Sequence, residues 1–258
     1  MGRSETGTDA YSFGDADELP EHTATVAAFE LDTFEVTVGR FRKFVQAYDG
    51  TLPAVGDGAH PLNAGTGWDS SWDAQMPTTR AELITDIKCD ANLQTWTDSP
   101  GSNENQPINC VNWYEAFAFC IWDGSRLPTE AEFEYAAAAG ADNRLFPWGS
   151  TFPDATYANY SAGAADSHVD VGSTPLGMGL YGQHDLSGSV WEWVFDTYSS
   201  LWYGGAGNTC DNCVNLSGSY RVNRGGGYTS NVPAIRPAKR SYDDPLANIR
   251  RHGMRCAR

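Results

Sequence analysis

The stretch RLPTEAEFEYAAAAG, residues 126–140, carries a complete set of helix signals. Thr129 is a typical N-cap residue, and Glu132, three positions later, stands where a capping box requires an acidic or amide side chain. Phe133 and Ala136 follow at helical spacing, and Gly140 ends the segment. The sequence therefore predicts a short helix with one apolar face.

Two further helices are predicted by the same reasoning. One follows Thr37 as N-cap and ends at Gly50. The other begins after Asn112, has Glu115 at the capping-box position and ends at Gly124. Their apolar faces are Phe41, Phe44, Val45 and Tyr48 in the first helix and Trp113, Ala116, Phe117, Cys120 and Ile121 in the second.

The rest of the chain reads as short strands and turns. Residues 23–31, 190–195 and 219–222 are predicted strands, and residues 51–109 are expected to be mostly loop. The 258 residues include 27 Gly, 13 Pro and 9 Trp, a composition typical of many turns around an aromatic core. We expect an α+β fold in which residues 1–258 form a single domain.

Charge and hydropathy exclude several functions. The formal net charge of −16 opposes binding to nucleic acid or to anionic membranes. No apolar run reaches the ~18 residues that a membrane-spanning helix needs. The first residues lack the basic and then apolar pattern of a signal peptide. We expect an extracellular, periplasmic or cell-surface protein from which an export signal or lipid anchor has been removed.

The six cysteines form an even set, which favours disulfides and an oxidising compartment. Six cysteines allow fifteen pairings, so spacing alone leaves the connectivity open. Cys210 and Cys213 have the spacing of a redox motif, but they lie between turn-rich segments, which favours a local structural disulfide over a redox centre or half a zinc site.

None of the five histidines has metal-ligand spacing, so each is expected to be a surface or loop residue. The glycines of RGGGY (224–228) lack the Gly-Lys-Ser/Thr ending of a phosphate loop and predict a tight backbone turn. Glu192 in GSVWEWVFD (188–196) is placed by strand alternation opposite two tryptophans. The residues around Glu192 favour two roles equally. One is a Ca²⁺ ligand, and the other is a carboxylate that accepts hydrogen bonds from loop amides.

Several motifs together resemble one family. The helical stretch 126–140 closely resembles the signature of the formylglycine-generating enzyme family, also called sulfatase-modifying factors. The resemblance implies that family's variant of the C-type-lectin-like fold, with a small sheet core, few helices and abundant ordered loop. It continues in order through FEVTVGRFRKF (34–44), PINCVNWYEAFAFCIWDG (107–124), FPWG (146–149), YGQHDLSGSVWEWVFD (181–196), RVNRGGGY (221–228) and RRHGMRCAR (250–258).

The resemblance also implies structural calcium and a disulfide framework. One calcium loop would use the Glu192 carboxylate with carbonyls of Gly188 and Val190, although Ser189 stands where the family usually has Asn. The family's disulfide between the second helix and the C-terminal end matches Cys120 and Cys256, which leaves Cys210–Cys213 and Cys89–Cys110. A second calcium loop would use Asn159, Tyr160, Asp166 and His168, with Asp170 as an alternative acidic ligand.

The family's copper site is where this sequence departs from the pattern. In the enzymes a cysteine pair shortly after the Arg-Gly-Gly motif binds Cu(I), for which thiolates are suitable ligands. The matching positions here are Ser230 and Ile235, so copper and the cysteine-oxidase reaction are not expected. Another branch, the ergothioneine sulfoxide synthases, holds iron through histidines supplied largely by a separate helical domain, which these five histidines do not replace.

Two classes of function remain after this comparison of motifs. We favour a calcium-stabilised, monomeric binding module whose surface at residues 228–240 recognises a protein, peptide or small molecule. That segment is also a candidate for hypervariability. The alternatives are an enzyme with different, oxidative chemistry in the equivalent cleft and an active formylglycine-generating oxidase. The cleft candidates for catalysis are Tyr228, Ser230, Arg236 and Arg240, together with Arg224 and Asp185.

Overall fold

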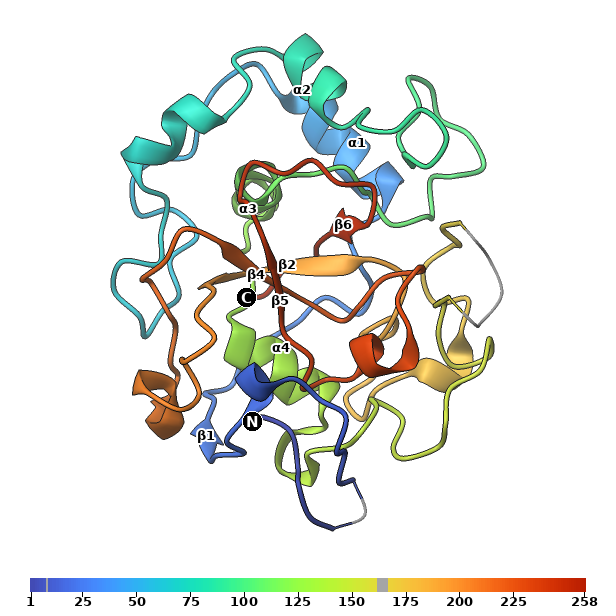
Figure 1. Cartoon of the computed structure of the whole chain (residues 1–258). Coiled ribbons are helices and arrows are strands. Elements are labelled where there is room, and N and C mark those ends of the chain that lie inside the picture. The colour runs from blue at the N-terminus through green and yellow to red at the C-terminus, as the bar shows by residue number, and fades with distance from the viewer. Residues whose placement is uncertain (8, 162–166) are drawn as a thin grey trace.

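A four-stranded sheet lies at the centre of the computed structural model, which describes residues 1–7, 9–161 and 167–258 (Figure 1). The strand order is β5-β4-β2-β6, with β2 antiparallel to β4 and parallel to β6. A separate pair of short parallel strands joins β1 to β3. The strands are β1 (Ala24–Thr25), β2 (Trp191–Thr197), β3 (Cys210–Asp211), β4 (Arg221–Arg224), β5 (Ser241–Asp243) and β6 (His252–Gly253).

The helices begin where their caps predict. The helices predicted after Thr37, Asn112 and Thr129 are confirmed, the last two with complete capping boxes. A fourth helix was missed because residues 51–109 were expected to be loop, although Thr79 and Glu82 form a capping box there. The α-helices are α1 (Val38–Ala47), α2 (Arg80–Asp86), α3 (Trp113–Trp122) and α4 (Glu130–Ala137). The 3₁₀ turns are η1 (Ala16–Glu18), η2 (Ser70–Gln75), η3 (Gly140–Asp142), η4 (Pro175–Gly177), η5 (Ala206–Thr209) and η6 (Val232–Ile235).

Strand β2 is buried on both faces because α3 and α4 lie on opposite sides of the sheet (Figure 1). Trp193 and Phe195 pack into the cluster that contains α3, whereas Val194 packs into the cluster that contains α4. This confirms the predicted alternation, which places Glu192 on the same face as Val194. A carboxylate in that position is enclosed by protein.

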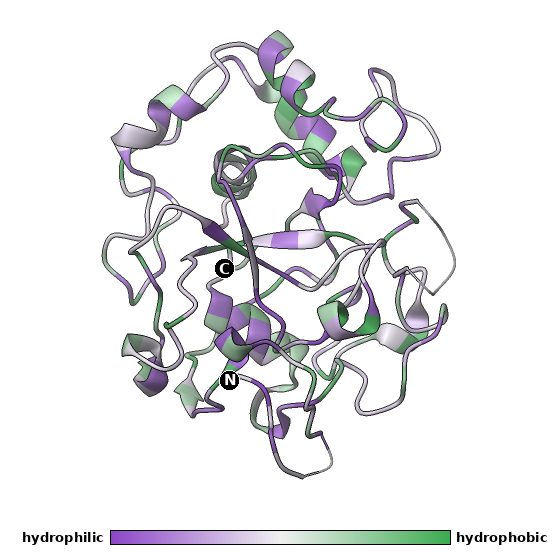
Figure 2. Cartoon of the chain, in the orientation of Figure 1, coloured by the Kyte–Doolittle hydropathy of each residue, from purple (hydrophilic) through white to green (hydrophobic). Residues whose placement is uncertain are grey.

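Aromatic side chains dominate the core on the α3 side. Phe41 of α1 stacks on Phe119 of α3 with ring centroids 5.2 Å apart, and Trp113 and Phe117 are 5.4 Å apart. Figure 2 shows α3 as largely hydrophobic, whereas α4 has hydrophilic positions within a buried helix. Those hydrophilic positions are the buried glutamates Glu130, Glu132 and Glu134.

Two predicted strands have different bounds in the structure. The predicted strand at 23–31 is divided, since its start pairs with β3 as β1 whereas Leu31 forms an isolated antiparallel bridge with Ala257. The strand predicted at 219–222 is shifted to β4, where it pairs with β2 and β5. Both differences arise from long-range pairing, which determines strand length more than local propensity does.

All six cysteines form disulfides, in the three pairs that the resemblance implied. Cys120–Cys256 ties α3 to the last residues of the chain across a sequence separation of 136. The other pairs are Cys89–Cys110 and Cys210–Cys213. No helix in the described residues, 1–7, 9–161 and 167–258, is both long and apolar enough to cross a membrane.

The capping box of α3 makes a prediction about pH. Glu115 is fully buried, accepts a hydrogen bond from the Asn112 backbone N–H at 2.8 Å, and has a pKa that burial raises to about 8. The usual pKa of Glu is about 4.3 in an unfolded chain. Between these values the unfolded state releases a proton that the folded state keeps. The free energy of unfolding therefore falls with rising pH, by up to about 1.4 kcal/mol per pH unit from this group.

Glu115→Gln keeps an acceptor for the cap but does not ionise, so it should flatten this decline in urea unfolding experiments between pH 5 and pH 8. Glu82→Gln is the matched control, because Glu82 holds the same capping position in α2 but is exposed. A decline that is equally steep in wild type and in the Glu115→Gln variant would contradict the prediction.

Candidate functional site

Residues 225–236 form a loop that leaves the end of β4 and returns beside it. Gly225 and Gly226 have positive φ angles of 90° and 79°, which favour glycine. A Cβ atom on Gly226 would lie 2.7 Å from the Ala234 carbonyl oxygen. The glycines thus serve the tight turn that the sequence predicted, and they bring the two halves of the loop together.

Arg224 closes the base of this loop. Its guanidinium donates to the carbonyl oxygens of Pro237 at 2.7 Å and Lys239 at 2.9 Å, which lie beyond the far end of the loop. The same guanidinium donates to the Glu134 carboxylate of α4. Although burial opposes ionisation, Arg224 holds the pKa of Glu134 below its usual value. The Arg224 side chain therefore links both ends of the loop to Glu134 of α4.

Arg240 repeats this arrangement one helical turn away. Its Nε and Nη2 donate to the two carboxylate oxygens of Glu130 at 2.8 and 2.9 Å, a bidentate geometry. The Glu130 backbone N–H donates to Asp196 of β2 at 2.7 Å. Burial and the Glu130 charge raise the pKa of Asp196 to about 7. Helix α4, strand β2 and the chain after the loop are joined by these contacts.

Arg236 is the third buried arginine of the segment. Its Nη2 donates to Glu18 Oε1 at 2.7 Å, and its guanidinium lies 4.2 Å from the centre of the Tyr11 ring. The expected recognition surface at 228–240 is therefore wrong for its arginines, because Arg236 and Arg240 are buried in ion pairs and do not face solvent. Tyr228 is buried as well. The exposed and half-buried positions lie mainly at residues 229–234.

The two positions of the expected copper ligands have other roles in this structure. Ser230 Oγ accepts a hydrogen bond from the Gly227 backbone N–H at 2.9 Å, so it caps its own turn. Ile235 is fully buried and packs in a cluster with Phe146, Ala158 and Tyr160. A hydroxyl that caps a turn and an alkyl group in the core do not provide the thiolates that Cu(I) favours.

Tyr228 packs edge-on against His168, with ring centroids 4.4 Å apart. His168 Nε2 lies 3.0 Å from the Arg250 carbonyl oxygen, and burial lowers the pKa of His168 to about 4. Burial raises the pKa of Tyr228. Both rings are therefore neutral at pH 7, so this pair offers no formal charge to a ligand.

The histidines were predicted to be surface or loop residues. His60 and His168 lie in loops as expected but are buried, whereas His252 lies in strand β6 and is buried as well. His60 Nε2 is 3.4 Å from the Glu132 carboxylate, and His252 Nε2 is 3.0 Å from the Asp243 carboxylate. Carboxylate partners allow imidazole nitrogens to be buried, and these partners lie far away in the sequence, where spacing rules do not detect them.

Glu192 is bound differently from the free calcium ligand that the resemblance implied. Arg255 donates to both of its carboxylate oxygens, at 2.7 and 2.8 Å, and both side chains are fully buried. The carboxylate therefore already has a counter-charge. The Gly188 N–H donates to the Gly225 carbonyl oxygen at 2.9 Å, so the expected calcium loop lies directly against the RGGGY turn.

Glu35 is a buried carboxyl group in this region that the sequence analysis missed. It accepts hydrogen bonds from Ser189 Oγ at 2.9 Å and from the Val190 backbone N–H at 3.2 Å. Burial, followed by the charges of Asp185 and Glu192, raises the pKa of Glu35 well above its usual value. The signal in the sequence was a single acid between the apolar residues of FEV (34–36).

Asp185, a candidate for the catalytic cleft, is already hydrogen-bonded to the backbone, because it accepts from the Gly172 N–H at 2.6 Å.

Asn159 fits the second expected calcium loop better than Glu192 fits the first, because its Oδ1 is a buried acceptor without a hydrogen-bond partner among the described residues. The His168 carbonyl accepts from Gln106 Nε2 at 3.5 Å, and the Tyr160 hydroxyl donates to the Pro153 carbonyl at 2.7 Å. Asp166 lies outside the described residues.

Within the part of the chain that the structure describes, no three His, Cys, Asp or Glu side chains form a group that could hold a metal ion. Asp170, the alternative acidic ligand, is exposed. A calcium site of the expected kind would therefore depend on carbonyl and amide oxygens as well as carboxylates.

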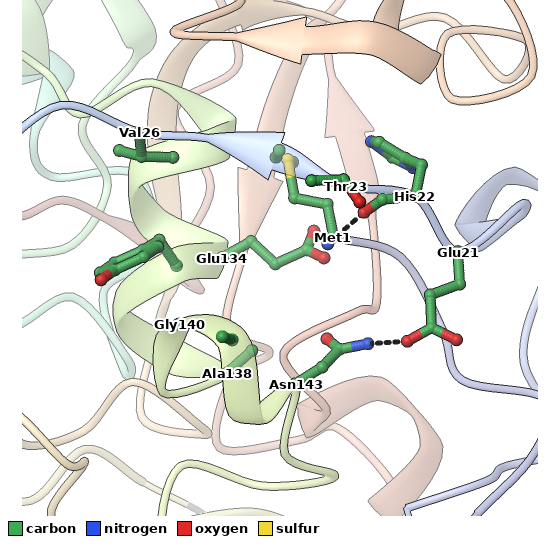
Figure 3. Close-up of a pocket in the computed structure, with 12 residues that line it drawn as sticks. Met1, Glu21, His22, Thr23, Val26, Glu134, Ala138, Gly140 and Asn143 are labelled. Atoms are coloured by element: carbon green, nitrogen blue, oxygen red, sulfur yellow. Dashed lines mark hydrogen bonds between the residues drawn. The ribbon is translucent and has the colours of Figure 1, made fainter.

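A pocket of about 520 Å³ lies between the start of the chain, residues 21–26 and the C-terminal part of α4 with the turn that follows it (Figure 3). The Met1 ammonium donates to the His22 carbonyl oxygen there at 2.9 Å, and Asn143 Nδ2 donates to Glu21 Oε1 at 2.7 Å. Glu134 lines this pocket and also binds Arg224, so the pocket and the base of the loop share one buried carboxylate.

The small sheet, the few helices and the three disulfides agree with the family that the motifs resembled. The sequence matches the family described as the sulfatase-modifying factor enzyme 1-like domain over residues 1–258. The chain belongs to the formylglycine-generating enzyme (sulfatase-modifying factor) family.

Relatives of this chain include a hercynine oxygenase and a formylglycine-generating enzyme. The chain is 32% identical over 261 residues to a hercynine oxygenase of Mycolicibacterium smegmatis, covering 93% of this chain and 55% of that protein. It is 30% identical over 278 residues to the formylglycine-generating enzyme of Mus musculus, covering 97% of this chain and 71% of that protein. The chain thus spans about half the length of the hercynine oxygenase that it matches.

Solved structures support the fold. PvdO from Pseudomonas aeruginosa superposes with a TM-score of 0.67 at 24% identity, covering 100% of this chain and 89% of that chain. Treponema denticola variable protein 1 superposes with a TM-score of 0.61 at 22% identity, covering 92% and 86%. The expected α+β fold, with few helices, a small sheet and much loop, is confirmed.

Proposed function

We propose that this domain is a recognition module on the formylglycine-generating enzyme fold, and that residues 229–234 contact its protein, peptide or small-molecule partner. The proposal rests on the residues that occupy the two positions where the family's enzymes have copper-binding cysteines. Ser230 caps a turn, Ile235 is part of the core, and all six cysteines are held in disulfides. No thiolate remains for the oxidase chemistry of the family.

The chemistry of the loop supports recognition without charge. Residues 229–234 read TSNVPA and contain no ionisable side chain, although the whole chain has a formal net charge of −16. Val232 of this loop packs against the Ile235 cluster, as do the partly buried Leu145 and Trp148. Hydroxyl, amide and indole groups of this kind suit an uncharged partner, since a formal charge would find no counter-charge within the loop.

Export and calcium belong to the same proposal. Three disulfides favour an oxidising compartment. Asn159 Oδ1 is buried and has no hydrogen-bond partner among the residues that the structure describes, which supports a calcium ion held by the expected set of Asn159, Tyr160, His168 and Asp166. In that position the ion would hold an irregular loop in place, which is a structural role.

A second candidate function is an oxidative reaction other than the copper-dependent one. The observation in its favour is the similarity to hercynine oxygenases and formylglycine-generating enzymes. The cleft candidates argue against it, because Arg224, Arg236 and Arg240 are committed to buried ion pairs. A catalytic role for any of them would require breaking such a pair.

The recognition proposal predicts ligands that depend on the loop. Wild-type protein and a variant with Thr229→Ala, Asn231→Ala and Val232→Ala should be screened against the same neutral peptide and glycan arrays. These three side chains are exposed or half-buried, so the variant should fold normally. We expect the variant to bind the ligands of the wild-type protein with an affinity at least tenfold lower. Ligands that bind wild type and variant equally would contradict the proposed surface.

Copper chemistry is tested directly with a CxPxR peptide, Cu(I) and oxygen, followed by peptide mass measurement. Wild-type protein should leave the cysteine unchanged. The double variant Ser230→Cys and Ile235→Cys is the matched comparison, and it should bind Cu(I) more tightly in a competition assay because it regains two thiolates. Formylglycine production by the wild-type protein would overturn the proposed function.

Calcium removal should lower the melting temperature. Chelation with EDTA is expected to reduce it by several degrees and calcium, but not magnesium, should restore it, because calcium tolerates the irregular oxygen geometry of a loop. Asn159→Ala should reduce the calcium-dependent shift. Equal melting temperatures with EDTA and with calcium would rule out the structural ion.

A further inference from the structure

The chain near its N-terminus crosses the segment that follows the loop. We define residues 11–18 as the N-terminal strap, which ends in the 3₁₀ turn η1 beside α4 (Figure 1, dark blue). Glu18 on this strap accepts from Arg236 Nη2 at 2.7 Å, and the two side chains are 0% and 2% exposed. Tyr11 on the strap lies under the same guanidinium at 4.2 Å.

Two further contacts join the strap to the same segment. Arg240 Nη1 donates to the Asp17 carbonyl oxygen at 3.2 Å, and Lys239 forms an ion pair with Asp15. Within the strap, Gly14 lets the chain pack closely on Glu18 and Arg3, because a Cβ atom there would lie 2.3 Å from Glu18 Oε2 and from Arg3 Cδ. The strap thus contacts Arg236, the last residue of the loop, and residues 239 and 240 just after it.

Arg236 is the side chain that links the strap to the interior of the loop. Its Nε donates to the Pro233 carbonyl oxygen at 3.0 Å while its Nη2 binds Glu18. Two bonds hold the loop to distant segments, since Ser187 Oγ donates to the Ile235 carbonyl oxygen at 2.6 Å and the Ser161 N–H donates to the Ser230 carbonyl oxygen at 3.0 Å. The turn bonds within the loop are local, namely Ser230 N–H to the Gly227 oxygen at 2.8 Å and Ala234 N–H to the Asn231 oxygen at 3.0 Å. Between the Ser230 and Ile235 anchors, Arg236 holds the Pro233 carbonyl.

We propose that the N-terminal strap is a conformational clamp that fixes residues 229–236. Displacing Glu18 leaves a buried guanidinium without its carboxylate, which is costly enough that Arg236 turns to solvent and releases Pro233 with it. The core stays folded, because Arg224 and Arg240 keep their own partners on α4. An ordered loop loses less conformational entropy on contact with a partner, so the strap would also set affinity. The clamp itself does not depend on what the loop binds.

Hydrogen exchange measured by mass spectrometry tests the clamp. Glu18→Gln removes the charge and keeps the shape, and it should accelerate exchange at the amides of Ser230 and Ala234 by roughly 100-fold or more, while α3 changes by less than about threefold. Asp15→Asn is the matched control on the same strap. It removes a largely exposed ion pair, so exchange in the loop should remain within about threefold of wild type.

A second variant covers the case in which Glu18→Gln does not fold. Arg236→Lys keeps a positive charge beside Glu18 but loses the bond to Pro233 and the flat contact with Tyr11, so Ala234 should exchange at least about tenfold faster. Unchanged exchange in the loop of the folded variant would overturn the clamp. Equal acceleration in the loop and in α3 would also overturn it, because the strap would then stabilise the whole domain without a separate effect on the loop.

Discussion

The structure depends on charge pairs between the glutamates of α4 and arginines, two of which come from distant parts of the chain. Glu130 and Glu134 lie one turn apart and bind Arg240 and Arg224, whereas Glu132 binds Arg126. All these side chains are almost completely buried. Removing one partner of a buried pair costs roughly 3–5 kcal/mol, since the other charge remains without compensation. The pairs therefore hold long loops in place in a domain whose central sheet consists of short strands.

Arginine suits this task because it carries five donors in a planar fork. Arg224 uses this fork to bind a carboxylate and two backbone carbonyls at once. Such contacts satisfy backbone groups of loops that cannot pair within a sheet. The arginines that the sequence suggested as a recognition surface thus support the loop from within, and residues 229–234 at its tip carry no ionisable side chain.

The sequence predicted the features that are determined by residues close together in the chain, such as the starts of helices. Thr129 with Glu132, and Asn112 with Glu115, are local signals that place helices α4 and α3 correctly. The same signal at Thr79 was overlooked within a segment judged by its composition. Partners such as Glu18 and Arg236 are 218 residues apart, so no local pattern could reveal that both are buried. The pairing of Glu192 with Arg255 was beyond local patterns for the same reason, because the two residues are 63 positions apart.

Position 235 shows how this fold can keep its shape without the expected metal ligand. A thiolate there would need a partner thiolate or a metal to be stable near the core, whereas Ile235 contributes apolar contact with Phe146 and Tyr160. Fully burying a side chain of this size stabilises a protein by about 1.5–3 kcal/mol. Ser230 adds a hydrogen bond within the turn. Both replacements support the loop from within, so its order does not require copper. In the proposed recognition function, an ordered and uncharged loop on a scaffold held by disulfides and buried ion pairs would select its partner by shape.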